Sequence, residues 1–363
     1  MFLRNAWYAA GFSDEFGRNL LARTYLNEAV VIFRTQDGKA VALEDRCAHR
    51  RLPLSMGRLV GDQLECGYHG LVYDCAGACV KIPGQSRESI PPGARVRTYP
   101  VVDRHFYLWI WMGEPARADA SLIPDYSLIG APGGDRHRIK LHVLCNYQLI
   151  IDNLLDLSHL PYVHSTTTGS PPLSENATIK TVRTGNTVQI KRWVRDVVPS
   201  PTFVQFGKFK GRVNLWQVSE YSPPSYVRVG YGSSDASVPI GEDDDVWNRG
   251  AWGFSVLHGI TPETDTTTHQ FRYVAFTPNF GEEAVITEFN RQNDQIITED
   301  RDIFKVQQRA LDSDPRGFTA LDLRSNVTIN ADQGLLAARR ILADCLQNEA
   351  ASPAAVAAAR KSA

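Results

Sequence analysis

Cys47-Ala48-His49 and Cys66-Gly67-Tyr68-His69 each place one cysteine ahead of one histidine, and residues 50–65 separate the two stretches. Cysteine thiolates and histidine imidazoles are ligands for iron and zinc. Because both stretches have the same order, two converging loops can place both sulfurs on one metal ion and both imidazoles on a second one. This arrangement predicts a [2Fe-2S] cluster in which histidine replaces cysteine on one of the two irons.

A single zinc ion held by the same four side chains is the main alternative. Zinc fingers usually place their two cysteines together and their two histidines together, whereas here each cysteine is paired with a histidine. The flanking residues also favour the cluster, because residues 47–54 (CAHRRLPL) and 66–70 (CGYHG) resemble the ligand motifs of Rieske [2Fe-2S] proteins. We therefore predict a Rieske cluster held by these two cysteines and two histidines.

Four further cysteines stand outside these motifs, and only Cys75 and Cys79 form another close pair. They lie in a segment with Gly77, directly after the second motif. We interpret them as small residues that flank a turn rather than as a metal or redox site. Free thiols are compatible with a reducing compartment.

Length and charge limit the classes of function. The 363 residues exceed the usual length of one domain, so we expect two. The 39 basic and 40 acidic residues are intermixed and leave a net charge of −1, which gives no support to nucleic-acid or anionic-membrane binding. No secretory leader pattern opens the chain, and no stretch has about 18 uninterrupted apolar residues. We therefore expect a cytoplasmic protein without a membrane span.

Hydrophobic patterning predicts two sheets and several helices. Residues 7–112 contain short β-branched and aromatic runs punctuated by Gly and Pro, as in a small antiparallel β domain. Further strands and helices follow after a Gly- and Pro-containing segment. The later strands are expected at 137–146, 187–193, 226–231 and 270–276, and the helices at 147–159, 283–310 and 331–348.

These patterns predict an α+β fold with two domains. The first, residues 1–118, is an antiparallel β domain that carries the two metal loops. The second, residues 119–350, has an antiparallel sheet covered by helices. The Ala-rich tail, residues 351–363, is expected to fray.

A second group of polar residues lies around the helix expected at 147–159. Asp156 and His159 are three residues apart and share one helical face. His164 follows five residues later, about 140° further around an unbroken helix. Pro161 lacks the backbone N–H that a helix interior needs. We therefore expect the helix to end or kink at Pro161, which allows His159 and His164 to face one metal ion.

Two histidines and one carboxylate form the facial triad of non-haem Fe(II) oxygenases, which leaves iron positions open for dioxygen. In the helix expected at 283–310, Asp300 projects near the middle of the apolar face, whereas Asp302 points almost opposite. Glu299 lies at the edge of that face and Asp294 outside it. A carboxylate within an apolar face is costly unless it is paired or binds a metal. We therefore predict Asp300 as the third ligand.

With both metal motifs in this order, the chain resembles the oxygenase component of Rieske-type aromatic oxygenases over nearly its whole length. Within that group it is most similar to vanillate O-demethylase oxygenase, and also to dicamba monooxygenase. Besides the two cysteine–histidine motifs, the resemblance is carried by residues 4–8 (RNAWY), 152–164 (DNLLDLSHLPYVH), 260–264 (ITPET) and 298–300 (TED). It implies a catalytic domain of helix-grip type and a ring-shaped homotrimer.

The resemblance also implies a role for particular side chains. In this family, electrons pass from the cluster of one subunit to the iron of the next. The implied roles are Cys47 and Cys66 on one cluster iron, His49 and His69 on the other, His159, His164 and Asp300 on a mononuclear Fe(II), Asp156 as a bridge from His69 of one subunit to His159 of the next, Asn153 beside the metal ligands, and His258 at the substrate. Trp252 is a further candidate for the substrate pocket because it is aromatic, and a place in the core is the alternative. A carboxylate suits the bridge because it accepts from two imidazole N–H groups.

The expected activity is that of a monooxygenase that demethylates or hydroxylates a small, vanillate-like aromatic acid with O2. Electrons are expected from NAD(P)H through a separate flavin and iron-sulfur reductase, because the chain has no glycine fingerprint for a nucleotide. Leu52 and Tyr68 stand where respiratory Rieske proteins have disulfide cysteines, which predicts a lower potential within the wide Rieske range.

Two alternatives remain open at this stage. The first is a different oxidation by the same iron, on an aromatic methyl group or on the ring. The second is a Rieske electron carrier without oxygenase activity. An electron carrier needs only about the first third of the chain and binds about two irons instead of three.

Overall fold

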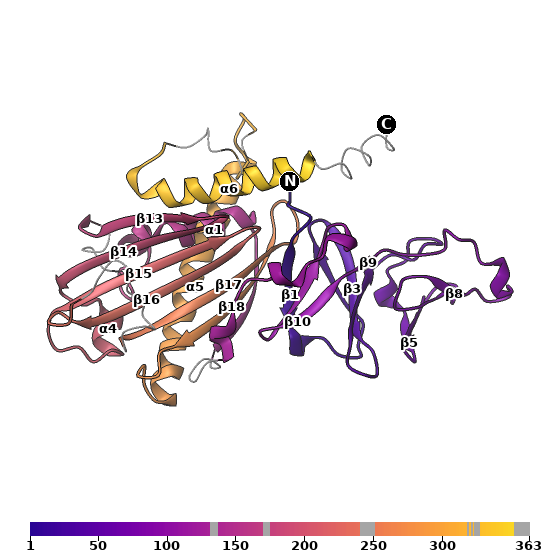
Figure 1. Cartoon of the computed structure of the whole chain (residues 1–363), viewed down its shortest axis with the longest axis horizontal. Helices are drawn as coiled ribbons and strands as arrows, with labels where there is room; N and C mark the ends of the chain where they lie inside the picture. Colours follow the sequence, from indigo (N-terminus) through magenta and orange to yellow (C-terminus); the bar gives the residue numbers. More distant parts are fainter. Residues whose placement is uncertain are drawn as a thin grey trace. The chain divides into compact units, whose positions relative to one another are not determined.

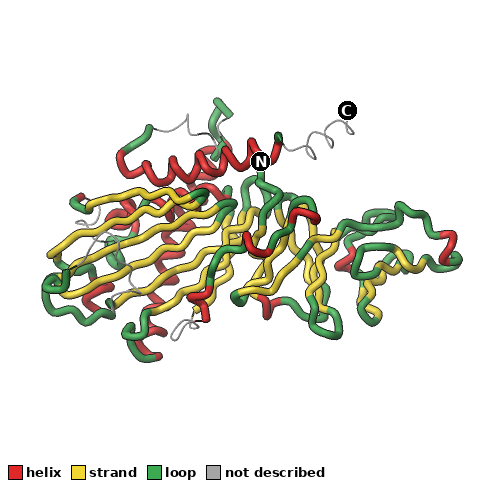
Figure 2. Tube along the Cα trace, in the orientation of Figure 1, coloured by secondary structure: helices red, strands yellow, loops and turns green. Residues whose placement is uncertain are grey.

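A computed structural model describes residues 1–130, 137–169, 175–239, 251–317, 319–320, 322 and 327–351. The chain forms two compact units, Met1–Ile123 with Thr261–Asp265 and Pro124–Ile260 with Thr266–Ala363 (Figure 1). The first unit consists of antiparallel sheets, and the second has one large sheet with helices (Figure 2). The predicted α+β class is therefore confirmed. Of the tail expected to fray, only Ala351 lies within the described residues.

The first unit contains three antiparallel sheets, with strand orders β1-β11-β10, β2-β3-β4-β9 and β5-β6-β7-β8. The strands are β1 (Trp7–Phe12), β2 (Leu21–Tyr25), β3 (Glu28–Arg34), β4 (Ala40–Glu44), β5 (Arg58–Val60), β6 (Gln63–Glu65), β7 (Val72–Tyr73), β8 (Cys79–Lys81), β9 (Thr98–Tyr99), β10 (Val101–Arg104) and β11 (Tyr107–Trp111). The first cysteine–histidine motif begins three residues after the end of β4, and the second directly follows β6. Both motifs thus lie in loops between strands, as predicted.

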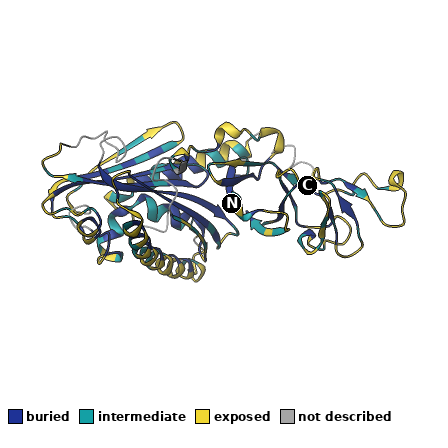
Figure 3. Ribbon diagram, turned by 90° about the horizontal axis from the view of Figure 1, so that it is seen from below, coloured by how far each residue is buried: buried dark blue, intermediate teal, exposed yellow. Residues whose placement is uncertain are grey.

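The second unit is built on a seven-stranded antiparallel sheet of order β12-β18-β17-β16-β15-β14-β13. Its elements are β12 (His137–Val143), α1 (Tyr147–Leu155), α2 (Leu160–Val163), β13 (Thr178–Thr184), β14 (Thr187–Val197), α4 (Pro201–Gln205), β15 (Val213–Ser222), β16 (Tyr226–Asp235), β17 (Trp252–Pro262), β18 (Thr268–Phe276), α5 (Glu283–Asp312) and α6 (Gln333–Ala350). The adjacent strands β15, β16, β17 and β18 are mostly buried, whereas the edge strands β12 and β13 are largely accessible (Figure 3). Among the described residues, no helix combines the length and apolarity that a membrane span requires.

Helix α5 packs against the sheet through a stripe of apolar side chains. Ile286 and Phe289 join the core cluster that contains Phe254 and Phe276 of the sheet. Further along α5, Ile297 and Phe304 are also buried. Because they lie three residues before and four residues after Asp300, this helical face carries Asp300 toward the interior, whereas Asp302 is exposed. The orientation expected from the apolar pattern is confirmed.

The helix expected at 147–159 is interrupted earlier than predicted. Helix α1 ends at Leu155, and Asp156 adopts an extended conformation with φ −113° and ψ 94°. The Asp156 carboxylate accepts a hydrogen bond from the Ser158 N–H at 2.9 Å and so caps the 3-10 turn Leu157–His159. Pro161 lies in the first turn of α2, where its missing N–H costs nothing. The predicted break at Pro161 was therefore wrong, because the capping carboxylate ends the helix first.

An ion pair joins α6 to α1. Arg339 Nε donates to Asp152 Oδ1 at 3.0 Å, and Arg339 Nη2 also donates to Oδ2. The side chains are only 6% and 23% exposed. In so dry an environment, removal of one partner leaves the other charge uncompensated.

We predict that Asp152→Asn lowers the free energy of unfolding by about 3 kcal/mol, because it leaves Arg339 buried and unpaired. The double variant Asp152→Leu/Arg339→Met should regain most of this loss in urea denaturation. A matched control is Arg183→Gln, which removes an exposed pair with Asp344 and should cost less than about 1 kcal/mol. Equal losses in the single and double variants would show that the pair does not hold α6.

Candidate functional site

The two loops that follow β4 and β6 share one backbone arrangement. In each loop the cysteine N–H donates to the carbonyl five residues later, and the N–H four residues later donates back to the cysteine carbonyl. These hydrogen bonds are Cys47 to Leu52 (2.9 Å), Arg51 to Cys47 (3.0 Å), Cys66 to Leu71 (2.8 Å) and Gly70 to Cys66 (3.1 Å). Arg51 and Gly70 occupy equivalent positions with φ of 60° and 69°, so both loops turn through the left-handed region.

This arrangement brings the predicted cluster ligands together in two layers. Cys47 and Cys66 are each only 2% exposed, and burial raises the pKa of the Cys66 thiol. His49 and His69 are exposed, and their ring centroids are 4.5 Å apart. The Tyr73 hydroxyl lies 3.2 Å from Cys47 Sγ. Two buried sulfurs below two neighbouring exposed imidazoles fit a cluster with a cysteine-bound inner iron and a histidine-bound outer iron.

The other close cysteine pair shows no sign of a shared site. Cys75 is exposed, and its thiol contacts the Asp62 carbonyl at 3.3 Å. Cys79 is buried in β8, and its thiol contacts the Lys81 carbonyl at 3.4 Å. Both thiols are free, which agrees with the interpretation of a turn.

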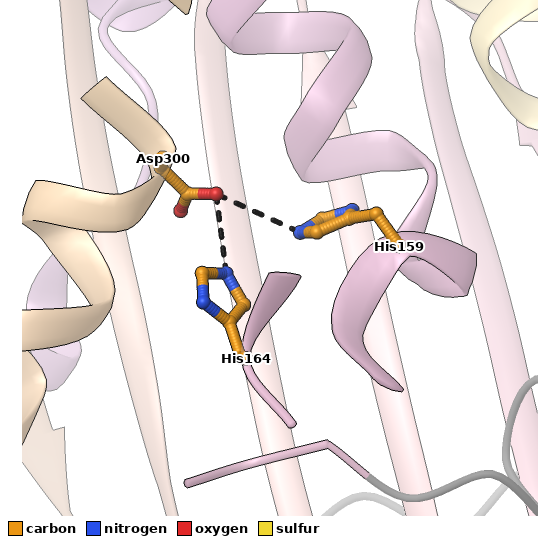
Figure 4. A group of neighbouring side chains, drawn as sticks. All are labelled: His159, His164 and Asp300. Atoms are coloured by element: carbon orange, nitrogen blue, oxygen red, sulfur yellow. Dashed lines mark hydrogen bonds and ion pairs between the residues drawn. The ribbon is translucent and has the colours of Figure 1, made fainter. Parts of the chain in front are cut away.

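A second constellation forms where α5 approaches the turns after α1 (Figure 4). Asp300 Oδ1 lies 3.1 Å from His164 Nε2 and 3.8 Å from His159 Nε2. The possible ligand atoms of the three residues all lie within 4.8 Å of one another. His159 ends the 3-10 turn, His164 follows α2, and Asp300 comes from α5. The structure therefore brings together the three predicted ligands of the mononuclear site.

The opposite nitrogen of each imidazole is held by an acceptor. His159 Nδ1 lies 2.6 Å from the Asp156 carbonyl oxygen. His164 Nδ1 lies 2.7 Å from Glu299 Oε2. Because Nδ1 carries the proton in such contacts, each Nε2 is left with its lone pair directed at the common centre. Two imidazole nitrogens and one carboxylate oxygen in this arrangement fit the donor set of non-haem iron.

The two histidines differ in electrostatic environment. Burial lowers the pKa of His159, which favours the neutral, ligating form. Burial also disfavours protonation of His164, but hydrogen bonds and charges from Asp300 and Glu299 outweigh it and raise the pKa of His164. The site thus carries excess negative charge around a buried ring, as a cation-binding site requires.

Comparison with known proteins identifies the protein family to which a chain with these two centres belongs. Residues 143–348 match the vanillate O-demethylase oxygenase C-terminal domain, and residues 6–100 match the Rieske [2Fe-2S] domain. The chain belongs to the vanillate O-demethylase family of Rieske oxygenases. It is the oxygenase component of a Rieske non-haem iron monooxygenase, with a [2Fe-2S] cluster and mononuclear iron as cofactors. The alternative of a simple electron carrier is wrong, because the matched C-terminal domain makes up more than half of the chain.

Three relatives illustrate the similarity. The chain is 40% identical to a putative toluene-4-sulfonate monooxygenase iron-sulfur subunit from Comamonas testosteroni, over 96% of this chain and 98% of that protein. It is 34% identical to a vanillate O-demethylase oxygenase subunit from a Pseudomonas species, over 98% and 99% of the two chains. The crystal structure of dicamba monooxygenase bound to 3,6-dichlorosalicylic acid superposes with a TM-score of 0.85 at 28% identity, covering 97% and 99% of the two chains.

Asp156 is placed differently from the simple bridge expected for a Rieske oxygenase. Its backbone carbonyl, and not its carboxylate, contacts His159. The carboxylate caps Ser158 and lies 3.4 Å from Arg192 Nη2. It remains 21% exposed and lines a surface hollow together with His159. Asn153 lies beside the triad, with Nδ2 3.3 Å from Asp300 Oδ1.

A cavity adjoins the triad, and it contains one of the two predicted substrate residues. His258 lines this cavity, with Nδ1 3.1 Å from Gln270 Nε2. Trp252 is not among its described lining residues; its indole N–H donates to the Phe280 carbonyl, and its ring stacks on Phe280 in the core. The described lining is Asn153, Leu154, Leu157, His159, Leu160, His164, Thr168, Val229, Tyr231, Phe254, Val256, His258, Arg272, Phe289, Asn293, Ile296 and Asp300.

The cavity offers about 50 Å³ of free volume, less than the roughly 150 Å³ of a cavity that accepts benzene. Binding of an aromatic ring therefore requires lining side chains to move aside. Two polar neighbours of this centre were not predicted from the sequence, Glu299 as the partner of His164 and Arg272 in the cavity wall. The position of Glu299 next to Asp300, at the edge of the same apolar face, was the available signal.

We predict that Asp300→Ala removes the mononuclear iron and preserves the cluster. Iron content should fall from about three to about two per chain, while the visible absorption of the cluster is unchanged. The matched control is Asp302→Ala, which alters the exposed carboxylate two residues away and should keep all the iron. Full iron content in Asp300→Ala would mean that another group supplies the third ligand.

Glu299→Gln is predicted to weaken iron binding without removing a ligand. The variant loses the charge that orients His164, so iron affinity should fall by about tenfold to hundredfold. Competition with a calibrated Fe(II) chelator measures this change. Wild-type affinity in Glu299→Gln would show that the contact with His164 Nδ1 has no role in holding the metal.

Proposed function

We propose that this protein oxidises a methyl or methoxy carbon on a small aromatic acid with dioxygen. The observation that carries the proposal is the triad of His159, His164 and Asp300 at the wall of a cavity lined by aromatic and aliphatic side chains. Iron held by these residues would supply dioxygen activation, with electrons delivered through the cluster. Hydroxylation of a methoxy carbon gives a hemiacetal that releases formaldehyde, whereas hydroxylation of a methyl carbon gives a stable alcohol.

The protein side chains position the substrate and keep water out. Phe254, Phe289 and Val256 form an apolar wall that suits an aromatic ring. Asn153 lies within hydrogen-bonding distance of Asp300 and so restricts the carboxylate. His258, buried and neutral, offers a polar contact in the same cavity. These groups favour one orientation of the ring relative to the triad.

Methyl hydroxylation is a specific second candidate beside O-demethylation. The chain is more identical to the toluene-4-sulfonate monooxygenase subunit, at 40%, than to the vanillate O-demethylase subunit, at 34%. Toluene-4-sulfonate carries a methyl group, and vanillate carries a methoxy group. Both are small aromatic acids, so they share the proposed substrate class.

Electrons are proposed to arrive from a flavin and iron-sulfur reductase that uses NAD(P)H. They then pass from the exposed His69 of one subunit to the partly exposed carboxylate of Asp156 in the next, within a homotrimer. The accessibility of both groups supports this route, because a fully buried group cannot meet a neighbouring chain. A reducing compartment such as the cytoplasm suits the protein, since Cys47 and Cys66 must reach iron as thiolates.

A substrate screen tests the proposed reaction. The holoprotein, supplied with a surrogate reductase, should oxidise at least one of vanillate, 4-methoxybenzoate, 4-methylbenzoate and 4-toluenesulfonate. Release of formaldehyde identifies O-demethylation, and a hydroxymethyl product identifies methyl hydroxylation. Failure of the iron-replete protein to form product from any methyl- or methoxy-substituted arene would contradict the proposal.

Asp156→Asn tests the electron route. Asparagine caps a turn as well as aspartate does, so the contact with Ser158 should persist. In the presence of substrate and O2, loss of the charge should slow the oxidation of the reduced cluster by about a hundredfold. Stopped-flow absorbance measures this rate. The variant also loses the ion pair with the buried Arg192 and should be less stable, so the rate is measured on folded protein with full iron content. Asp302→Asn serves as the control for charge loss elsewhere. Wild-type kinetics in Asp156→Asn would exclude this carboxylate from the route.

A further inference from the structure

Arg272 is an unpaired charge inside the catalytic unit. Its side chain lies in the wall of the cavity beside the triad and is 7% exposed. Nε and Nη1 are buried without a hydrogen-bond partner, and the guanidinium forms no ion pair within the described ranges of the chain. Arg339, by comparison, is held by Asp152. A buried cation without a partner is costly, so its presence calls for an anion.

The position of Arg272 on the sheet explains how it reaches the cavity. Side chains alternate along β18, so Arg272 shares a face with Val274 and Phe276. Those two residues belong to the core cluster that packs against α5. The same face therefore continues from apolar core to a cation next to the metal-binding side chains. This change from apolar to charged lining divides the cavity into a part for a ring and a part for a charged group.

The surrounding groups leave Arg272 available to a ligand. Burial lowers the pKa of Arg272 to about 10, although Asp300, Tyr231 and the exposed Asp294 act in the opposite direction, so the side chain remains charged at neutral pH. Asp300 Oδ1 faces the two imidazole Nε2 atoms at the metal-binding centre and not the guanidinium. Burial, reinforced by Arg272, holds the pKa of His258 well below its usual range. His258 is thus neutral and does not compete for an anion by charge.

We propose that Arg272 is the specificity-determining residue that binds the anionic substituent of the substrate, a carboxylate or a sulfonate. The inference rests on the proposed oxidation of an aromatic acid and assigns the residue that selects for the acid. The planar guanidinium presents parallel N–H donors that match two oxygens of either group. With the anion fixed at Arg272, the rest of the ring extends along the apolar wall toward the triad. Neutral arenes lack this contact and leave the buried cation unpaired.

Binding to the iron-replete protein tests this assignment without turnover. The probes are 4-methoxybenzoate and 4-toluenesulfonate, each compared with its neutral amide, 4-methoxybenzamide and 4-toluenesulfonamide. Wild-type protein should bind each anion more tightly than its amide in calorimetry. Arg272→Met should lose about tenfold to hundredfold in affinity for the anions, as expected for hydrogen bonds to a charged group. Its affinity for the amides should be unchanged, and Arg183→Met, which removes an exposed arginine, should behave as wild type.

The proposal also predicts the thermal stability of the Arg272→Met variant. Because Arg272 has no structural partner, Arg272→Met should unfold at a temperature equal to or above that of the wild type. A variant that fails to fold would show that the guanidinium serves the structure, and the proposal would be overturned. Wild-type affinity for both anions in a folded Arg272→Met protein would overturn it equally. The separate carboxylate and sulfonate probes show which anion the Arg272 guanidinium binds more tightly.

Failure of this inference can be separated from failure of the proposed function. If wild-type protein oxidises the amides as rapidly as the acids, the oxygenase function stands and the role of Arg272 falls. If the anions bind through Arg272 and no arene is oxidised, the anion site stands and the proposed oxidation falls.

Discussion

The catalytic unit depends on the approach of two imidazole Nε2 atoms to one carboxylate oxygen of Asp300. Such an approach is unfavourable without a cation between the three groups, and it requires that the two rings be held in place. The chain fixes them with two acceptors, the Asp156 carbonyl for His159 and the Glu299 carboxylate for His164. Helix α5 supplies both Glu299 and Asp300, so its packing against the sheet sets the geometry of the triad. The metal site is therefore as rigid as the core beneath α5.

Much of the two centres was predictable because their signals are local. The cluster ligands lie in two short loops, each with one cysteine followed by one histidine: Cys47 and His49, and Cys66 and His69. This spacing is enough to indicate a ligand set divided between two loops. Asp300 needed only the periodicity of one helix, because a carboxylate within an apolar stripe stands out. The sheet and the long helices likewise followed from periodicity over many residues.

Other features depend on choices that the sequence pattern leaves open. Both Asp156 and Pro161 can end a helix, and capping of Ser158 by Asp156 determined the outcome. Trp252 is an aromatic residue suited to a pocket or to a core, and only packing against Phe280 placed it in the core. Arg272 belongs to an alternating strand, but alternation does not tell which face meets α5. Long-range contacts decided each of these positions.

We infer that two separate sets of side chains on one chain hold two iron centres. Anomalous diffraction from crystals of the holoprotein at the iron absorption edge tests it most directly. We predict one strong peak for the cluster among Cys47, His49, Cys66 and His69, and a second, weaker peak among His159, His164 and Asp300. The inference is contradicted if the second peak is missing. It is also contradicted if that peak persists in data collected just below the iron edge, because the metal there is then not iron.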